Sequence, residues 1–234
     1  YSGDFNLMGG IYRDVWLIVT NKTHFNNRFG NDGILFETLD VNESKASYKI
    51  NSSFLGAKAP YSGNVTYQLL FNGEIIKEGA KEFKSVFVGI NDEIRNPKLW
   101  SPETPNLYQL TVQLKNPNGE IVDEILQNVG FKWVGISNKK EFLLNGKPYK
   151  LKGASRHQDY KNIGNALTDA MHVKDIELMK AMGCNFLRIA HYPQDPAIYD
   201  ACDRLGLITW SEIPVVDKVV NNKTFFDNSA LMMK

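Results

Sequence analysis

The chain has 234 residues, of which 43% are hydrophobic and 23% are charged. This composition is typical of a globular protein with an apolar core, and it excludes disordered and collagen-like classes. The 27 basic and 26 acidic residues leave a formal net charge of +1, so no nucleic-acid partner is predicted. No run reaches the roughly 18 to 20 uncharged apolar residues that cross a bilayer, and no membrane partner is predicted.

The first segment, residues 1–26, contains one candidate strand. Residues 9–20 read as a β-strand, and the next twenty residues offer it no partner strand. We expect it to be the closing strand of a sugar-binding domain that lies upstream, so that the chain is cut at its front. The first four residues lack the basic start and apolar stretch of a signal peptide.

Residues 27–136 have the texture of an all-β sandwich, because short β-branched and aromatic runs alternate with turn signals. Four runs predict strands: residues 47–53, 65–71, 107–114 and 121–129. Asn-Gly pairs at 72–73 and 118–119 each predict a type I′ hairpin turn, since both residues accept a positive φ. We expect an immunoglobulin-like sandwich, although the Cys and Trp signature of antibody domains is missing.

Residues 137–234 change to an alternation of strands and helices. A hairpin at Asn145-Gly146 leads into a first strand at 149–154, and residues 185–190 and 207–213 predict two further strands. The first helix is expected to start at Thr168 or Asp169 and to end at Gly183. Its apolar face is expected to contain Val173, Ile176, Met179 and Met182.

The second helix has clear boundary signals. Asp195 is a candidate N-cap, Pro196 fits the first helical position, and Gly206 is expected to end the helix. A third helix is expected at about residues 224–234. Apolar strands joined by single helices predict right-handed βαβ units with parallel strands. The predicted fold class is thus multidomain β plus α/β, with a sandwich followed by the first three β/α units of an incomplete TIM barrel.

Several ordered motifs resemble glycoside hydrolase family 2, which contains β-galactosidases, β-glucuronidases and β-mannosidases. Residues 9–15 resemble the last strand of the family's sugar-binding jelly roll, and residues 99–108 resemble part of its immunoglobulin-like domain. The barrel segment carries the most specific matches: Arg-His-Gln-Asp at 156–159, Ala-His-Tyr-Pro at 190–193 and Glu-Ile-Pro at 212–214. The first and last of these look closest to the β-galactosidase-like members.

The resemblance implies a retaining β-glycosidase that hydrolyses terminal β-linked sugars, with β-galactosides preferred. β-Glucuronidase and β-mannosidase activities stay open as alternatives within the family. The family uses two glutamates at the ends of the fourth and seventh barrel strands, and a retaining pair stands about 5 to 5.5 Å apart. Both are expected beyond Lys234. No catalytic residue is therefore predicted within this chain, and the isolated chain is predicted to be inactive.

The candidate substrate-binding residues follow the three predicted strands, where barrel enzymes place their chemistry. They are Arg156, His157 and Asp159 after the first strand, His191 after the second, and Glu212 at the end of the third. On spacing alone, residues 156–159 could be a solvated loop with an Arg156–Asp159 ion pair. The resemblance instead implies that His157, Asp159 and His191 bind the terminal sugar.

Other roles remain open for the acidic and neighbouring residues. Glu212 and Asp159 could form a catalytic pair of their own at an inverting distance. Arg188 is expected to be an internal ion-pair partner that awaits carboxylates on absent strands, and thus to be uncompensated here. Trp210 could stack on a sugar, but a position inside a strand favours filling of the barrel. Cys184 and Cys202 are expected to be buried thiols.

No metal and no cofactor is predicted. Some family members hold magnesium shortly after the third strand, but residues 215–218 (Val-Val-Asp-Lys) do not provide a cluster of oxygen ligands. The sequence leaves the compartment open, with a periplasmic or secreted location preferred.

Two alternatives to an enzyme segment follow from the same sequence. The chain could be a noncatalytic immunoglobulin-like module that binds carbohydrate or protein, with the α/β part serving only as packing. Three parallel strands would also leave an open sheet edge, which favours homo-oligomers or other association through that edge.

Overall fold

The structure is a computed structural model, and it describes residues 9–28, 32–56, 62–215 and 218–233. Val216, Asp217 and Lys234, which the sequence placed in the metal stretch and at the end of the third helix, lie outside the described residues. The contacts divide the chain into two compact units. One contains residues 17–149, and the other contains residues 150–234 together with the segment up to Trp16.

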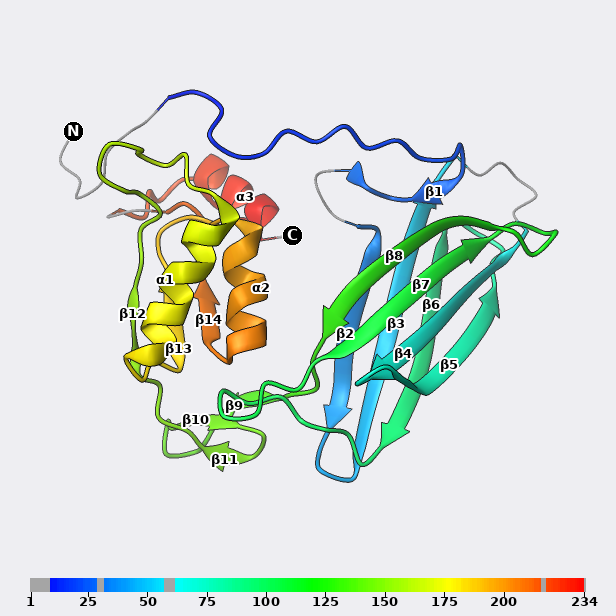
Figure 1. Cartoon of the computed structure of the whole chain (residues 1–234), viewed down its shortest axis with the longest axis horizontal. Helices are drawn as coiled ribbons and strands as arrows, with labels where there is room; N and C mark the ends of the chain where they lie inside the picture. Colours follow the sequence, from blue (N-terminus) through cyan, green and yellow to red (C-terminus); the bar gives the residue numbers. More distant parts are fainter. Residues whose placement is uncertain (1–8, 29–31, 57–61, 216–217, 234) are drawn as a thin grey trace. The chain divides into compact units, whose positions relative to one another are not determined.

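The first unit is a sandwich of two antiparallel sheets (Figure 1). In one sheet β3 (Lys45–Leu55) pairs on one side with β6 (Phe87–Arg95) and on the other with β2 (Ile34–Val41) and the short β1 (His24–Phe25). The other sheet has the order β5 (Glu74–Glu82), β4 (Asn64–Phe71), β7 (Tyr108–Lys115) and β8 (Ile121–Val129). The four strands expected from the sequence are therefore confirmed, as is the immunoglobulin-like alternation of strands between two sheets.

The core of the sandwich follows from the period-2 pattern of its strands. Along β3 and β7 alternate residues are buried, including Tyr48, Ile50, Leu110 and Val112. Phe131 lies against Tyr108 with ring centroids 5.0 Å apart and closes the core after β8. Both sheets cover this core, so its apolar residues are shielded on two sides.

The two Asn-Gly turns differ. Asn72 and Gly73 both have positive φ, which confirms the type I′ turn between β4 and β5. At the second turn only Gly119 has a positive φ, and its N–H donates to the carbonyl of Asn116. The predicted type I′ turn is wrong there, because Pro117 fixes a type I turn over residues 116–119 that ends in a glycine bulge.

The predicted strand at residues 9–20 is absent, because this described segment has no strand partner. Its apolar side chains are exposed, with Leu17 91% and Val19 85% accessible. A β-strand is held by hydrogen bonds to a neighbouring strand, and strand propensity alone does not supply them.

A short antiparallel sheet follows the sandwich, and it consists of β9 (Val134–Ile136), β10 (Phe142–Leu144) and β11 (Lys147–Pro148). The amide of Asn145 donates to the carbonyl of Trp100 at 3.0 Å. Trp100 is 1% exposed, so this hydrogen bond ties the hairpin to the sandwich core.

The second unit contains three parallel strands in the order β12 (Gly153–Ser155), β13 (Phe186–Ile189) and β14 (Ile208–Ser211). The helices α1 (Asp169–Ala181) and α2 (Pro196–Leu205) connect them, and α3 (Lys223–Met232) follows. Figure 1 shows α1 and α2 side by side on one face of the sheet, and the buried cluster of Ile176, Leu187 and Ile198 lies between the layers. The opening βαβαβ units of a TIM barrel domain are thus present, as an open sheet.

Local signals set the ends of these helices as expected. The Asp195 carboxylate accepts from the Ala197 N–H at 3.0 Å, and Gly206 ends α2 with φ +80°. Thr168 precedes α1, but its side chain makes no capping hydrogen bond. Met182 is 76% exposed, so its assignment to the apolar face of α1 is wrong: it lies at the C-cap, past the last turn that packs on α2.

A glycine allows the close contact between the first two parallel strands. A Cβ atom at Gly153 would lie 1.8 Å from the carbonyl oxygen of Phe186. Any larger residue would force β12 away from β13.

None of the helices in the described part of the chain has the length and apolar character needed to cross a membrane.

Candidate functional site

The polar residues predicted from the sequence lie at the carboxyl ends of three adjacent parallel strands. Arg156 directly follows β12, Ala190 and His191 follow β13, and Glu212 follows β14. The strands are in register, with Arg188 opposite Trp210, so the side chains of residues 188, 210 and 212 belong to one face of the sheet. This is the face opposite to α1 and α2, because Leu187 and Ile189 pack against the helices.

Arg188 and Glu212 form a bidentate ion pair on this face. Arg188 Nε donates to Glu212 Oε1 at 2.7 Å, and Nη2 donates to Oε2 at 3.1 Å. The expectation that Arg188 is uncompensated is therefore wrong, because its partner is on the third strand. The sequence could not identify it, since the pairing depends on the register between β13 and β14.

His191 completes this group. Its Nδ1 lies 3.3 Å from Glu212 Oε2 and 3.3 Å from Arg188 Nη2. A guanidinium can only donate, so His191 Nδ1 either accepts from Arg188 or donates to Glu212, depending on its tautomer. The peptide bond between Ala190 and His191 is cis.

The hydrogen bonds from Arg188 hold the pKa of Glu212 below its ordinary value. At neutral pH Glu212 is therefore an ionised acceptor, and it has no proton to give to a leaving group. Its two oxygens are already engaged by Arg188. This geometry suits Glu212 to binding and orientation rather than to general acid chemistry.

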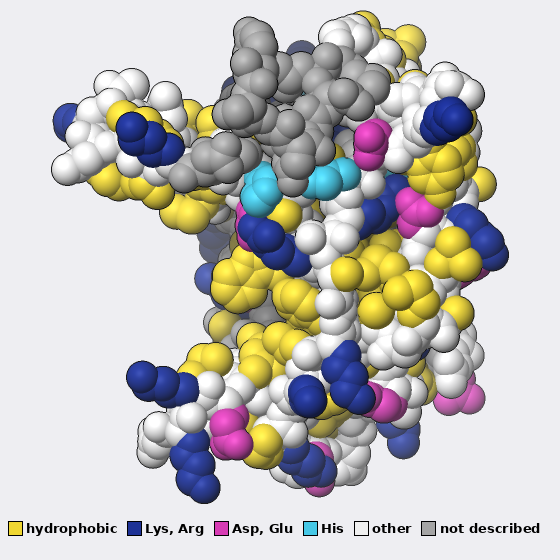
Figure 2. Space-filling view, turned by 90° about the vertical axis from the view of Figure 1, so that its left-hand side faces the viewer, with side chains coloured by type: hydrophobic (Ala, Val, Ile, Leu, Met, Phe, Trp, Pro, Cys, Tyr) yellow, Lys and Arg dark blue, Asp and Glu magenta, His cyan; other side chains and the backbone are white. Residues whose placement is uncertain are grey.

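His157 and Tyr192 lie beside His191. The rings of His157 and His191 have centroids 6.2 Å apart, and the ring of Tyr192 is stacked 6.0 Å from that of His157. His157 Nδ1 and the hydroxyl of Tyr192 are 3.4 Å apart. The structure therefore brings together His157, His191 and Glu212 of the predicted site, and adds Tyr192 and Arg188. In Figure 2 histidine side chains lie at the surface, with basic and acidic side chains nearby.

Two other predicted residues lie apart from this group. The side chain of Arg156 is only 7% exposed, and its Nη2 lies 2.6 Å from Asp175 Oδ2 on α1. The alternative of an Arg156–Asp159 pair is wrong, because Asp175 takes that place. Asp159 is exposed, and within the described part of the chain no hydrogen bond or ion pair joins it to the histidines.

Trp210 does not fill an interior here. It is 61% exposed and shares a face with Arg188 and Glu212. The expectation that it fills a barrel assumed a closed set of strands, whereas the sheet is open. The face consequently presents an aromatic surface next to an ion pair and two imidazoles, which are groups that match the apolar faces and paired hydroxyls of a sugar.

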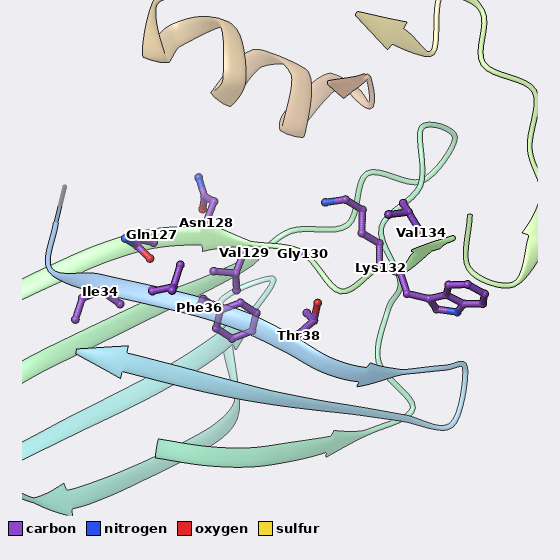
Figure 3. Close-up of a pocket in the computed structure, with 11 residues that line it drawn as sticks. Ile34, Phe36, Thr38, Gln127, Asn128, Val129, Gly130, Lys132 and Val134 are labelled. Atoms are coloured by element: carbon purple, nitrogen blue, oxygen red, sulfur yellow. The ribbon is translucent and has the colours of Figure 1, made fainter. Parts of the chain in front are cut away.

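A second concavity lies in the sandwich, between the edges of β2 and β8 (Figure 3). It has a volume of about 670 Å³, and Phe36, Thr38, Asn128 and Lys132 contribute to its lining. The ammonium of Lys132 lies 4.9 Å from the ring of Trp100. The lining contains neither a carboxylate nor a histidine, so this groove offers no acid–base pair.

Comparisons with known proteins agree with this architecture. The model described as glycosyl hydrolases family 2 matches residues 23–132, and the model of the glycosyl hydrolases family 2 TIM barrel domain matches residues 134–232. The division between them falls two residues after Phe131, where the sandwich core closes.

Three relatives illustrate the range of names. A putative β-glucuronidase of Formosa agariphila is 36% identical over 99% of this chain and 27% of that protein. A β-galactosidase of Thermoanaerobacter pseudethanolicus is 32% identical over 90% of this chain and 28% of that protein. The crystal structure of a Bacteroides uniformis β-glucuronidase is 40% identical, with a TM-score of 0.85 over 97% of this chain and 28% of that one.

The chain thus spans between a quarter and a third of the length of these relatives. Two adjoining models of one family cover nearly all of it, and the sheet order of both units agrees with them. On this evidence the chain belongs to glycosyl hydrolase family 2.

Proposed function

We propose that the protein acts as a retaining β-glycosidase and that this chain supplies part of the pocket for the terminal sugar. The observation that carries the proposal is the group formed by His157, His191, Tyr192 and the Arg188–Glu212 pair at the carboxyl ends of parallel strands. In barrel enzymes this end of the sheet holds the active site.

The substrate class is proposed as terminal β-glucuronides or β-galactosides. The sequence motifs favoured galactosides, whereas the relatives carry both names. A hydroxyl of the sugar can accept from or donate to imidazole nitrogens and the hydroxyl of Tyr192, and Trp210 offers a ring for stacking. These groups bind either sugar, so the choice between them is left to the assay below.

Bond cleavage is proposed to depend on carboxylates other than those in this group. A retaining enzyme needs a free nucleophilic carboxylate and a second carboxyl that carries a proton. Glu212 meets neither condition, because Arg188 occupies both of its oxygens and lowers its pKa. We therefore expect this chain to bind the sugar without cleaving it.

The test is a titration of the chain with methyl β-galactoside and methyl β-glucuronide, followed by NMR of the histidine rings, together with a turnover assay on the nitrophenyl glycosides. We expect a Kd on the order of 1–10 mM for one sugar, which corresponds to roughly 3–4 kcal/mol. His157→Ala and His191→Ala should abolish binding. His24→Ala is the matched control, because His24 belongs to the sandwich unit.

Two results would overturn the proposal in different ways. Binding that perturbs residues of the β2–β8 groove and spares the histidines would favour the noncatalytic sandwich module. Turnover by this chain that is lost in Glu212→Gln or Asp159→Asn would mean that the catalytic pair lies within these residues after all.

A further inference from the structure

Four buried polar side chains lie behind the two site histidines, on the helix side of the parallel sheet. Arg156 is 8% exposed, and Gln158, His172 and Gln194 are each 2% exposed or less. Buried polar groups are costly unless they are hydrogen bonded. Each of these four side chains has a hydrogen-bond partner, and all of the partners lie in the same unit.

Gln194 is bound twice to the loop that follows β12. Its Oε1 accepts from Arg156 Nη1 at 2.9 Å, while its Nε2 donates to the backbone carbonyl of Arg156 at 2.5 Å. One amide thus binds both the side chain and the main chain of a single residue. Only an amide with both a donor and an acceptor can do this.

A second link runs in the opposite direction. Gln158, from the loop after β12, accepts at Oε1 from the backbone N–H of Asp195 at 3.0 Å. Asp195 is also the N-cap of α2. The loops after β12 and β13 are therefore joined by two glutamines, one from each loop.

The remaining Arg156 donors fix these loops to α1. Arg156 Nε donates to Asp175 at 2.7 Å, and Nη2 lies 3.0 Å from His172 Nδ1. Burial, together with the nearby Arg156 charge, lowers the pKa of His172. The neutral ring can then accept from Arg156, and this places its proton on Nε2, 3.9 Å from Asp195.

These contacts have a direct consequence for the site. Arg156 and Gln158 both turn inward to bind the second loop. His157 stands between them in the chain, and its ring lies instead beside His191 and Tyr192. His191 and Tyr192 precede Gln194 by three and two residues, so the amide of Gln194 anchors the segment that carries them.

We propose that Gln158 and Gln194 are positioning residues, which set the distance between the imidazoles of His157 and His191 and thereby the affinity for the sugar. The sugar-binding part of this inference rests on the proposed function, whereas the geometric part does not. Neither glutamine touches the open face, and each acts through the loop that it fixes. Supporting residues of this kind hold binding groups within a fraction of an ångström of a working geometry.

The test uses Gln194→Met and Gln158→Met in the 234-residue chain, since methionine keeps the length and volume of glutamine but removes its hydrogen bonds. NMR of the four histidine rings reports the geometry directly. In Gln194→Met the ring signals of His157 and His191 and the cross-peak between them should change, whereas His24 should stay unchanged. Affinity for the sugar bound by the parent chain should fall about tenfold, because small misplacements of binding groups have large effects.

Two further variants separate positioning from stability. Ile176→Val removes one buried methylene from α1, away from the loops, and should lower the melting temperature while leaving ring signals and sugar affinity unchanged. Gln194→Glu keeps the acceptor for Arg156 and loses only the donor to its carbonyl, so its loss of affinity should be smaller than that of Gln194→Met.

The inference is overturned if folded Gln194→Met and Gln158→Met keep the parental signals of His157 and His191. It is equally overturned if Ile176→Val, at matched stability, changes the same signals. Should the parent chain bind no sugar while Gln194→Met still shifts both histidines, the proposed function fails and the geometric inference stands.

Discussion

The two units of the chain use similar polar contacts in opposite surroundings. In the sandwich, Tyr48 and Tyr67 are 0% and 1% exposed, and their hydroxyls lie 3.0 Å apart between the two sheets. In the parallel unit, the Arg188–Glu212 pair lies on a sheet face that no helix among the described residues covers, and the Arg188 side chain is 43% exposed.

The sandwich network crosses from one sheet to the other. Tyr67 on β4 donates to Asp92 on β6 at 2.6 Å, and Lys77 on β5 lies 2.8 Å from the same carboxylate. Burial raises the pKa of Tyr48 to about 12, so these hydroxyls stay protonated. A polar contact enclosed by two layers holds those layers together, whereas one on an open face keeps groups available to a ligand.

The largest effect is expected in the enclosed core. Leu110→Ala should lower the free energy of unfolding of the sandwich by about 3 kcal/mol, because Leu110 is fully buried and the space it leaves cannot collapse. Amide hydrogen exchange, resolved by residue, separates the sandwich from the second unit. Leu39→Ala is the matched control, since Leu39 is 60% exposed, and it should change stability by less than about 0.5 kcal/mol. Equal effects would contradict the assigned core.

An intermediate effect is expected where the two sheets are joined by a charge. Asp92→Asn should cost about 1–2 kcal/mol at pH 7, because Tyr67 and Lys77 lose a charged acceptor. Burial opposes ionisation of Asp92, but the hydrogen bonds from Lys77 and Tyr67 outweigh it and lower its pKa.

This lowered pKa gives the pH dependence a definite sign. The folded-state pKa of Asp92 lies below the unfolded value of about 4, so the stabilisation is complete above that pH and is lost as the pH falls through the folded-state value. The difference in urea midpoint between the parent and Asp92→Asn should therefore shrink below about pH 4. A difference that stays constant down to pH 2 would rule out this carboxylate as its source.

The smallest effect is expected on the open face. Trp210→Ala should change the free energy of unfolding of the parallel unit by less than about 0.5 kcal/mol, because the ring is 61% exposed. Trp100→Ala, which removes a ring that is 1% exposed, should cost about 3–5 kcal/mol in the sandwich. Thermal unfolding of both variants sharpens the comparison. A loss above 2 kcal/mol for Trp210→Ala would mean that this face is covered in solution.

The sequence was most informative where structure depends on neighbours a few positions apart. The cap at Asp195, the stop at Gly206 and the hairpin at Asn72-Gly73 were predicted correctly, because each rests on the φ preference or hydrogen bonding of one or two residues. The turn at Asn118-Gly119 was predicted with the wrong type, since Pro117 overrides the pair signal.

The candidate site was predicted less completely. Strand order placed His157, His191 and Glu212 at one edge of the sheet, as the structure has them. The sequence gave no means to see that Arg156 turns inward to Asp175, or that Arg188 meets Glu212 twenty-four residues later. Both outcomes depend on which face of a strand is covered and on the register with its neighbour.

By itself, then, the sequence determined the family, the two kinds of unit and the ends of most elements, because periodicity, turn residues and ordered motifs are local properties of the chain. Only the tertiary structure decided which charged groups are enclosed and which are open. Burial and ion pairing are properties of layers and registers, and they join residues such as Arg156 and Gln194 that lie far apart along the sequence.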